Sequence, residues 1–216
     1  MMKFDQHFLT NEKIAKQIVS FLDIKLNESI LEIGPGEGIL SKYIKKATLI
    51  EIDKDLVEKL KESFPNHNII NKSVLNVKLN YNKIIGNIPY SISEQLINKL
   101  INSNFKLCIL TVSEGFLKKG LLQLVIPNLL EVKELMKIDK KEFNPKPKIN
   151  SKVILIKKKE LNNKERLIKN IYTQSDKKLK NIINTKLIFK EKRVRELSLD
   201  EWSVLLNDIK RTSING

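Results

Sequence analysis

The sequence predicts an α/β protein with a mainly parallel, doubly wound sheet, followed by a small helical domain. Two observations support this fold class. Short apolar runs alternate with helical segments over the first 158 residues, which is typical of βαβ units. Beyond a polar stretch at residues 157–164, the pattern is helical only. A chain of 216 residues, 41% of them hydrophobic, is long enough to form a proper core.

The first half of the chain alternates strands and helices in a regular order. Strands are expected at residues 29–33, 48–52, 68–71, 83–86 and 106–112. Helices are expected at residues 11–22, 39–46 and 53–63, and a further one after residue 91. Asp53 is the expected N-cap of the third helix, and Ser91 with Glu94 forms a capping-box pattern for the fourth.

Three later segments are apolar or alternating and are expected to complete the sheet, at residues 121–127, 129–138 and 152–157. We therefore predict one domain over residues 1–158 and a small helical domain over residues 159–216. In the second domain, Ser198 and Glu201 form another capping box. A helical face is also expected from the apolar side chains at positions 179, 182, 183 and 187.

Positive charge is concentrated in one segment. The chain has a net charge of +15, and residues 133–195 carry 21 Lys and Arg against 7 Asp and Glu, a net +14. A basic segment is typical of proteins that bind a polyanion such as nucleic acid, because its cations neutralise phosphates. A lysine-rich composition explains many of these lysines, but it does not explain why acids are scarce among them.

A few simpler features limit the class of protein. The one cysteine, Cys108, lies in an apolar run and cannot form an internal disulfide, so we expect an inert buried thiol and a reducing cytoplasm. The two histidines, His7 and His67, form no metal-ligand cluster in the sequence, and no metal is expected. The apolar runs are too short to span a membrane.

A glycine-rich loop follows the first predicted strand. The segment IGPGEG places Gly34, Gly36 and Gly38 before a helix, where glycines allow a sharp turn and close approach of a ligand. Glu51 ends the second strand, where a carboxylate can accept both hydroxyls of a ribose. The G-x-G-x-G spacing and Pro35, which lacks an N–H group, fit S-adenosyl-L-methionine better than a dinucleotide. A glycine turn without a ligand is the alternative.

The segment Asn87-Ile88-Pro89-Tyr90 follows the fourth strand and borders the same cleft. Alone, it fits an ordinary turn before a helix. Beside the glycine loop, it fits methyl transfer to an exocyclic adenine amine, whose lone pair is delocalised into the ring. The Asn87 side-chain oxygen and the Ile88 carbonyl can accept the two amine hydrogens, and Tyr90 can stack on the base. Positioning and electrostatics would then drive the reaction.

Five segments together resemble one known family. They are QHFL (6–9), EIGPGEGIL (32–40), IEID (50–53), NIPYSIS (87–93) and FNPKPKINS (143–151). Their order and spacing are similar to those of the KsgA/Erm-type rRNA adenine N6-dimethyltransferases, over nearly the whole chain. The last segment and the tail favour the KsgA branch. The resemblance implies a Rossmann-like class I methyltransferase sheet in the domain of residues 1–158, with the helical domain of residues 159–216 binding RNA.

The resemblance also implies the reaction. The chain is expected to use S-adenosyl-L-methionine to dimethylate N6 of two adjacent adenosines near the 3′ end of small-subunit rRNA, during ribosome small-subunit biogenesis. Its expected partner is this rRNA or the pre-small ribosomal subunit, with no membrane involved. The chain is expected to act as a cytoplasmic monomer.

The resemblance assigns cofactor-binding roles to individual residues. His7 and Leu9 are expected to contact the methionine end of the cofactor. Gly34 and Gly36 are expected to lie against it, and Glu51 to hold the ribose.

It assigns catalytic roles to a second group. Asn87 is expected to bridge cofactor and substrate, and Pro89 belongs to the same segment. Tyr90 and Phe143 are expected to sandwich the target adenine, since a base taken out of its stack needs aromatic faces to replace the lost stacking. A buried Phe143 before a rigid Pro-x-Pro turn is the simpler alternative.

Several positions depart from the family pattern. Ser73 stands where the family usually has an aspartate that accepts a hydrogen bond from the cofactor's adenine amine, so weaker binding by about 0.5–1.5 kcal/mol is expected. The loop between Glu114 and Gly120 is shorter than usual, and the basic extension before the first motif is missing. Ser175 and Asp176 replace paired arginines of the tail.

Two alternatives to the rRNA methyltransferase remain, and these departures favour the first of them. The first is a ribosome-assembly or RNA-binding factor whose methyltransferase activity is weak or lost. The second is a small-molecule methyltransferase, which gives no role to the basic segment.

Overall fold

The computed structural model describes residues 6–118 and 120–211. Among them, no helix is both long and apolar enough to cross a membrane. The described chain divides into two compact units. One contains the residues up to 116 together with 132–158, and the other contains residues 117–131 together with those from 159 onward.

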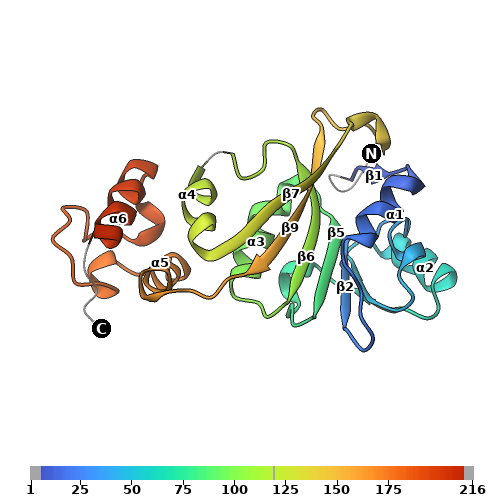
Figure 1. Cartoon of the computed structure of the whole chain (residues 1–216), viewed down its shortest axis with the longest axis horizontal. Helices are drawn as coiled ribbons and strands as arrows, with labels where there is room; N and C mark the ends of the chain where they lie inside the picture. Colours follow the sequence, from blue (N-terminus) through green and yellow to red (C-terminus); the bar gives the residue numbers. More distant parts are fainter. Residues whose placement is uncertain (1–5, 119, 212–216) are drawn as a thin grey trace. The chain divides into compact units, whose positions relative to one another are not determined.

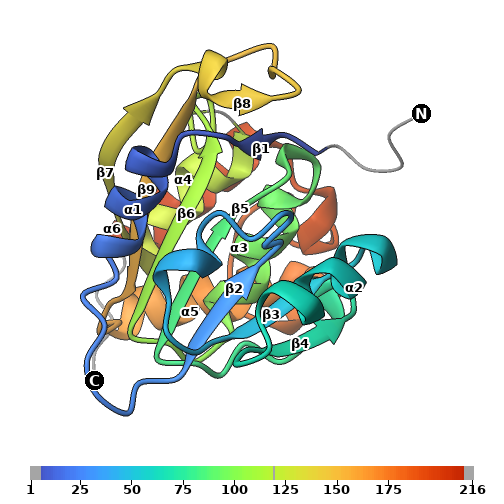
Figure 2. The same ribbon diagram turned by 90° about the vertical axis from the view of Figure 1, so that its right-hand side faces the viewer.

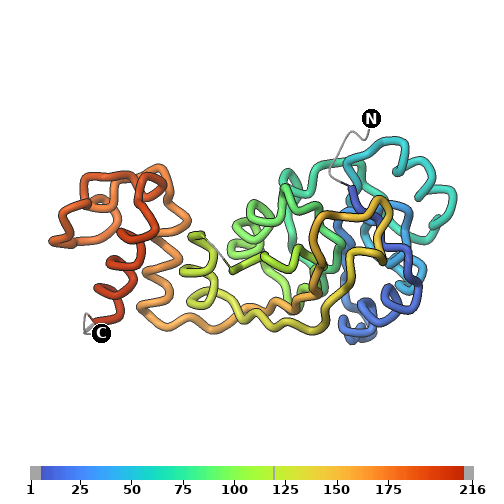
Figure 3. The backbone as a smooth tube through the Cα atoms, turned by 90° about the horizontal axis from the view of Figure 1, so that it is seen from above, coloured from blue at the N-terminus to red at the C-terminus, as the bar shows by residue number. Residues whose placement is uncertain are grey.

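The first unit is built on a seven-stranded sheet with the order β4-β3-β2-β5-β6-β9-β7 (Figures 1 and 2). Neighbouring strands from β4 to β6 pair in parallel, and β9 pairs antiparallel with β6. The bounds are β2 (Ile30–Ile33), β3 (Thr48–Glu51), β4 (Asn68–Asn71), β5 (Lys83–Asn87), β6 (Leu107–Ser113), β7 (Leu130–Ile138) and β9 (Ser151–Lys158). The predicted α/β fold with a mainly parallel sheet is confirmed, and β7 lies beside β9 at its edge (Figure 3).

Helices of this unit pack on a sheet that is buried on both faces. In the central strands β2, β5 and β6, consecutive residues point to opposite faces of the sheet, and nearly all of them are buried. Both faces are therefore covered, as is usual for parallel sheets. Helix α1 (Glu12–Ser20) begins at the predicted position, with the Asn11 side chain as its cap. Asp53 caps α2 (Lys54–Ser63) as predicted, and α3 (Ser93–Ile101) follows β5. The core around α1 includes Ala15, Ile18, Ile30, Leu49, Ile85 and Ile109.

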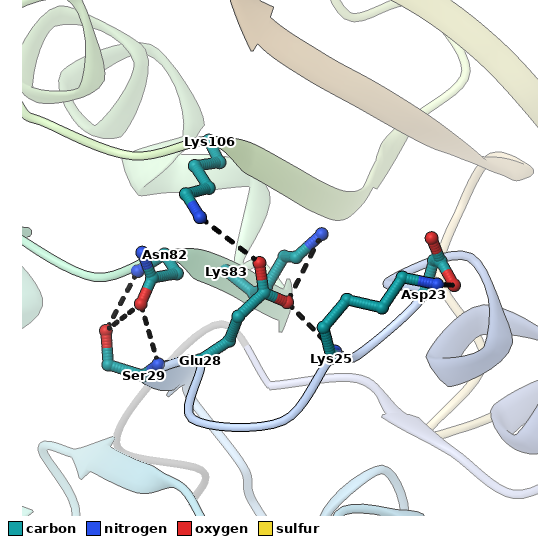
Figure 4. Close-up of polar contacts among 7 residues, drawn as sticks. All are labelled: Asp23, Lys25, Glu28, Ser29, Asn82, Lys83 and Lys106. Atoms are coloured by element: carbon teal, nitrogen blue, oxygen red, sulfur yellow. Dashed lines mark hydrogen bonds and ion pairs between the residues drawn. The ribbon is translucent and has the colours of Figure 1, made fainter.

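A polar cluster joins the loops that lead into β2, β5 and β6 (Figure 4). The largely buried Glu28 carboxylate lies 3.6 Å from the ammonium groups of both Lys83 and Lys106. Beside it, the Asn82 side-chain oxygen accepts hydrogen bonds from the main-chain N–H and the hydroxyl of Ser29. These contacts fix the amino ends of three neighbouring strands, at the edge of the sheet opposite their carboxyl ends.

The second unit is helical and contains α4 (Gly120–Leu129), α5 (Asn163–Thr173) and α6 (Leu199–Arg211), which contact one another. The predicted capping box at α6 is confirmed: Glu201 accepts from the Ser198 main-chain N–H, and the Ser198 hydroxyl accepts from the Glu201 N–H. Trp202 is almost fully buried and meets the ring of Tyr172 edge-on at a centroid distance of 6.2 Å.

The prediction of a sheet segment at residues 121–127 is wrong, since this run lies within helix α4. Residues 117–131 also group with the second unit, although the predicted first domain included them. A short, mostly apolar run such as this one, LLQLVIP, cannot be assigned to strand or buried helix by periodicity alone. The contacts of α4 with α5 and α6 decide the matter, because they bury its apolar side chains.

Two other expected helical features differ. The helix expected at residues 39–46 is only a 3₁₀ turn at Ser41–Tyr43, because the buried Ser41 hydroxyl is bonded to Glu32 and β3 starts soon afterwards. The Ser91/Glu94 capping box does not form. Instead, a 3₁₀ turn at Tyr90–Ile92 precedes α3, whose N-cap, Ile92, has no side-chain capping bond.

The helical face expected from position 179 to position 187 is also absent. Only a 3₁₀ turn at Leu179–Asn181 forms there. The main-chain N–H groups of Leu179 and Lys180 donate to the carbonyls of Lys192 and Lys190, respectively. These two bonds pair the segment with residues 190–192.

Candidate active site

A cavity of about 170 Å³ lies at the carboxyl ends of the central strands. β2 lies between β3 and β5, so the order of strands along the chain reverses there, which is where ligands bind in open α/β sheets. All but one of the predicted site residues line it, namely His7, Gly34, Gly36, Glu51, Ser73, Asn87, Pro89, Tyr90 and Phe143. The exception, Leu9, is buried in the hydrophobic core.

The glycine loop after β2 requires glycine for two reasons. Gly34 and Gly36 have φ angles of +62° and +58°, which disfavour residues with a side chain. A Cβ atom at Gly36 would also lie 2.8 Å from the ring of Phe8. At Gly34 an added Cβ would have only one neighbouring atom within 4 Å, the Asn87 carbonyl oxygen at 3.8 Å. The main chain of Gly34 therefore faces the open space of the cavity. A ligand can therefore approach this backbone closely.

Glu51 presents a carboxylate to the cavity while remaining 4% exposed. Oε1 accepts from the N–H groups of Ile52 and Asp53 at 2.8 and 3.0 Å, and Oε2 accepts from Gly36 N–H at 3.2 Å. Burial raises the pKa of Glu51, and these three donors partly oppose that shift. Because a carboxylate offers about four acceptor positions, about one remains for a ligand hydroxyl, on Oε2.

A second acid, Glu32, lies behind the glycine loop and was not singled out from the sequence. It is fully buried on β2, and its Oε2 accepts a 2.7 Å hydrogen bond from the Ser41 hydroxyl. Its Oε1 has no partner among the described residues. Burial, reinforced by the charge of Glu51, raises the pKa of Glu32 to about 7.

A small two-stranded sheet brings distant motifs to the cavity. β1 (Phe8–Leu9) pairs antiparallel with β8 (Phe143–Asn144), and the two lie side by side in Figure 2. The His7 Nδ1 lies 2.8 Å from the Pro145 carbonyl oxygen, which can only accept, so Nδ1 carries the proton of that bond. Phe143 lines the cavity, but it is only 4% exposed and also packs in the hydrophobic core, as does its cross-strand partner Leu9.

The side chain of Asn87 has a defined orientation. Its Nδ2 donates a 2.8 Å hydrogen bond to the His7 carbonyl oxygen, which excludes the flipped amide because two oxygens would then face each other. No hydrogen bond to its Oδ1 occurs among the described residues. Asn87 therefore offers a hydrogen-bond acceptor at the cavity, and the first motif fixes its direction.

The ring of Tyr90 is held at both sides. Its hydroxyl forms a 2.7 Å hydrogen bond with the hydroxyl of Ser151, a fully buried residue of β9. Its centroid lies 6.0 Å from that of His7. The Pro89 carbonyl accepts from Ile92 N–H and from the Ser93 hydroxyl, so it fixes the turn that carries the ring. The cavity wall thus has a rigid aromatic face.

Ser73 follows β4 and is the N-cap of a 3₁₀ turn at Val74–Asn76. Its hydroxyl oxygen accepts from Leu75 N–H at 3.3 Å. The neighbouring Lys72 and Val74 also line the cavity. This wall lies beyond Glu51, because Ser73 follows β4, and β4 is one strand further from the strand of Asn87 than β3 is.

Three residues that shape the site were not predicted from the sequence. Phe8 lines the cavity and packs over Gly36, as expected for a strand in which Leu9 faces the core. Lys72 lines the wall beyond Glu51. Ser151 was quoted in the last motif, yet its bond to Tyr90 has no signal in a single sequence.

The cavity residues fit S-adenosyl-L-methionine. Gly34 leaves main chain open to a ligand, and Glu51 keeps an acceptor position for a ribose hydroxyl. No phosphate is needed, and the cavity-lining residues include one cation, Lys72, on the wall away from the glycine loop. The cofactor supplies an electrophilic methyl group on a positively charged sulfur.

Comparison with known proteins agrees with this geometry. Residues 1–207 match the family described as ribosomal RNA adenine dimethylase. A ribosomal RNA small subunit methyltransferase A from Malacoplasma penetrans is 35% identical over 221 residues, covering 90% of this chain and 81% of that protein. An rRNA adenine N-6-methyltransferase from Streptococcus sanguinis is 37% identical over 171 residues, covering 71% of this chain and 69% of that protein.

Solved structures show the same fold. A dimethyladenosine transferase from Plasmodium falciparum superimposes with a TM-score of 0.68 at 23% identity, covering 95% of this chain and 98% of that one. The 23S rRNA methyltransferase ErmE also gives a TM-score of 0.68, at 18% identity, and covers 94% of this chain and 100% of that one. The sheet is thus that of class I methyltransferases. With its match over residues 1–207, this chain belongs to the ribosomal RNA adenine dimethylase family.

Proposed function

We propose that this chain transfers methyl groups from S-adenosyl-L-methionine to N6 of adenine in small-subunit rRNA. The orientation of the Asn87 amide supports this most directly. Its Nδ2 is bonded to the His7 carbonyl, so its oxygen is the atom available to a donor in the cavity. An exocyclic amine is such a donor, and family membership supports adenine as the base that carries it.

The chain's own groups would activate a weak nucleophile. Asn87 Oδ1 and the Ile88 carbonyl accept the two hydrogens of the adenine amine, which turns its lone pair out of conjugation with the ring. The lone pair then forms the new N–C bond while the C–S bond breaks and its electrons go to sulfur. The nitrogen loses one proton to solvent, and no titrating base is needed.

Aromatic residues would hold the base. Tyr90 and Phe143 come from segments distant in sequence and both line the cavity. Their rings replace the stacking that a base loses when it leaves RNA structure. Tyr90 keeps its orientation through Ser151, so its ring is set before substrate arrives.

The finer assignments belong to the same proposal. The substrate is two adjacent adenosines near the 3′ end of small-subunit rRNA, each dimethylated within the pre-small ribosomal subunit. The net +14 of residues 133–195 supports docking on rRNA phosphates. The helical unit that contains residues 159–211 contributes to this docking. The protein acts as a monomer in the cytoplasm.

An Asn87→Ala variant tests the role of the amide. Losing a positioned acceptor should slow methyl transfer to unmethylated small-subunit particles by about 10²–10³-fold, with particle binding retained. Asn66→Ala is the matched control, because Asn66 is exposed and does not line the cavity. Equal transfer rates for both variants would refute the role of Asn87. Loss of particle binding by the Asn87 variant would mean that its amide serves docking instead.

A further inference from the structure

A surface remote from the cavity combines positive charge with an exposed apolar turn. It lies at the amino ends of the central strands, where the segments leading into β3, β2, β5 and β6 lie side by side. Strand β9 runs antiparallel to β6 and ends at the same edge of the sheet. We call this the amino-edge surface, and it consists of residues 23–29, 45–47, 82–83, 106 and 157–158. It carries seven lysines and two acids, a net charge of +5.

One turn of the amino-edge surface is held in a fixed conformation (Figure 4). The Glu28 carboxylate accepts a hydrogen bond from Lys25 N–H at 3.0 Å, and Glu28 N–H donates to the Lys25 carbonyl at 3.4 Å. The same carboxylate lies 3.6 Å from the ammonium groups of Lys83 and Lys106, which ties the turn to β5 and β6. Within the turn, Asn27 has a φ angle of +63°, which asparagine tolerates better than most residues. The turn is therefore built to keep one shape.

This turn presents an apolar side chain at its tip. Leu26 is 91% exposed, and the nearby Ile24 is 40% exposed. Because β2 lies between β3 and β5, the tip has the exposed Lys45 and Lys46 on one side and the exposed Lys106 on the other. A single exposed leucine is common on protein surfaces. Here, however, a fixed turn holds it in solvent between cations, which is the arrangement of a docking surface.

We infer that the amino-edge surface is a second contact with rRNA, separate from the catalytic cavity. The choice of rRNA as the partner rests on the proposed function. Lysines neutralise phosphates, and some proteins insert leucine or isoleucine between base steps while nearby cations contact the backbone. The net charge of +5 favours a polyanion and disfavours a basic protein as the partner.

The distance between the two sites indicates two segments of RNA. Strand β6 has seven residues and runs from the amino-edge surface to the edge that bears the cavity. A strand rises about 3.3 Å per residue, so the two edges are roughly 20 Å apart, with the sheet between them. The target adenine and the RNA at Leu26 therefore belong to separate segments of the folded rRNA.

Binding measurements over a range of salt concentrations test the inference without a catalytic step. The ligands are protein-free small-subunit rRNA and unmethylated small-subunit particles. In the double variant Lys45→Gln/Lys46→Gln, the slope of log affinity against log salt concentration should become less steep by about 1.5, because two phosphate contacts are lost. Leu26→Ser should weaken binding to both ligands by about 10-fold, because a buried leucine contact is lost.

Three features keep this test specific. The substituted side chains are exposed, so all variants should unfold in urea at native concentrations. Leu26→Met keeps an apolar tip and should bind like the native protein. Lys16→Gln/Lys59→Gln removes two exposed lysines from α1 and α2, outside the amino-edge surface, and should leave the slope near its native value.

The outcomes separate the inference from the proposed function. Weaker binding by both test variants, with native behaviour of both controls, supports the inference. Native binding by both test variants overturns it, as does an equal change of slope in the Lys16/Lys59 control. Weaker binding to particles alone, with unchanged binding to protein-free rRNA, also overturns it, because the partner is then a ribosomal protein. Native protein that binds particles through this surface but transfers no methyl group would refute the proposed function and leave the contact standing.

Discussion

Replacing Glu32 with glutamine should remove a pH-dependent loss of stability. Glu32 is fully buried, and only one of its carboxylate oxygens has a partner among the described residues, the Ser41 hydroxyl. Burial raises its pKa from the ordinary value of 4.5 to about 7. Glutamine has nearly the same shape and can still accept from Ser41, but it never carries a charge.

The sign of the effect follows from proton binding. The folded state holds the Glu32 proton more tightly than the unfolded state, so this carboxyl favours folding most below pH 4.5. That contribution is lost as pH rises from 4.5 to about 7. The difference between the two pKa values corresponds to about 3 kcal/mol in the free energy of unfolding.

Urea denaturation of both proteins between about pH 4.5 and pH 8 measures this effect. The free energy of unfolding of the native protein, minus that of Glu32→Gln, should fall by about 3 kcal/mol across the range. A constant offset between the proteins does not matter, because only the pH dependence is compared. Glu58→Gln, on the exposed face of α2, is the control for replacing a glutamate. A difference that stays flat with pH would refute the reasoning.

Three further substitutions test the site. Glu51→Gln should weaken S-adenosyl-L-homocysteine binding by about 10-fold or more in calorimetry, because charge-assisted bonds are lost; an unchanged affinity would contradict this. Tyr90→Phe should lower the free energy of unfolding by about 1–3 kcal/mol, by leaving the buried Ser151 hydroxyl unpaired, but keep methyl transfer within about fivefold. Abolished transfer would mean that the phenol acts chemically. Gly36→Ala should cost at least about 1–2 kcal/mol in urea denaturation, from its positive φ and the contact with Phe8; native stability would show that the loop adapts.

The parallel core of the first unit was predictable because its strands are buried on both faces. Such strands appear in the sequence as short apolar runs, and the strand predicted at residues 29–33 matches β2 (Ile30–Ile33), which is buried at every position. The N-cap at Asp53 was predictable, because capping depends on neighbouring residues, but the same kind of signal failed at Ser91 and Glu94, where a 3₁₀ turn forms instead. Residues 121–127 were assigned wrongly, since tertiary contacts decide the structure of a short, mostly apolar run.

The part of the site that follows from the order of strands along the chain was predictable. Glu51 and Asn87 end strands that flank β2, so parallel pairing alone brings them to one edge. The contacts that orient the site were not predictable. The Asn87–His7 and Tyr90–Ser151 bonds join residues 80 and 61 positions apart, and no local pattern encodes them. The pairing of β1 with β8 is more distant still, since it joins Phe8 to Asn144 and Leu9 to Phe143.

The most direct test of the central claim is the product of one reaction. The native protein is incubated with methyl-labelled S-adenosyl-L-methionine and unmethylated small-subunit particles, and the rRNA is cut by a base-specific ribonuclease into oligonucleotides that are sequenced by tandem mass spectrometry. We predict labelled N6,N6-dimethyladenosine from two adjacent positions near the 3′ end, and its absence when Asn87→Ala replaces the native protein. Particles that bind the native protein yet yield no label at adenine N6 would contradict the account and favour an RNA-binding factor without this activity.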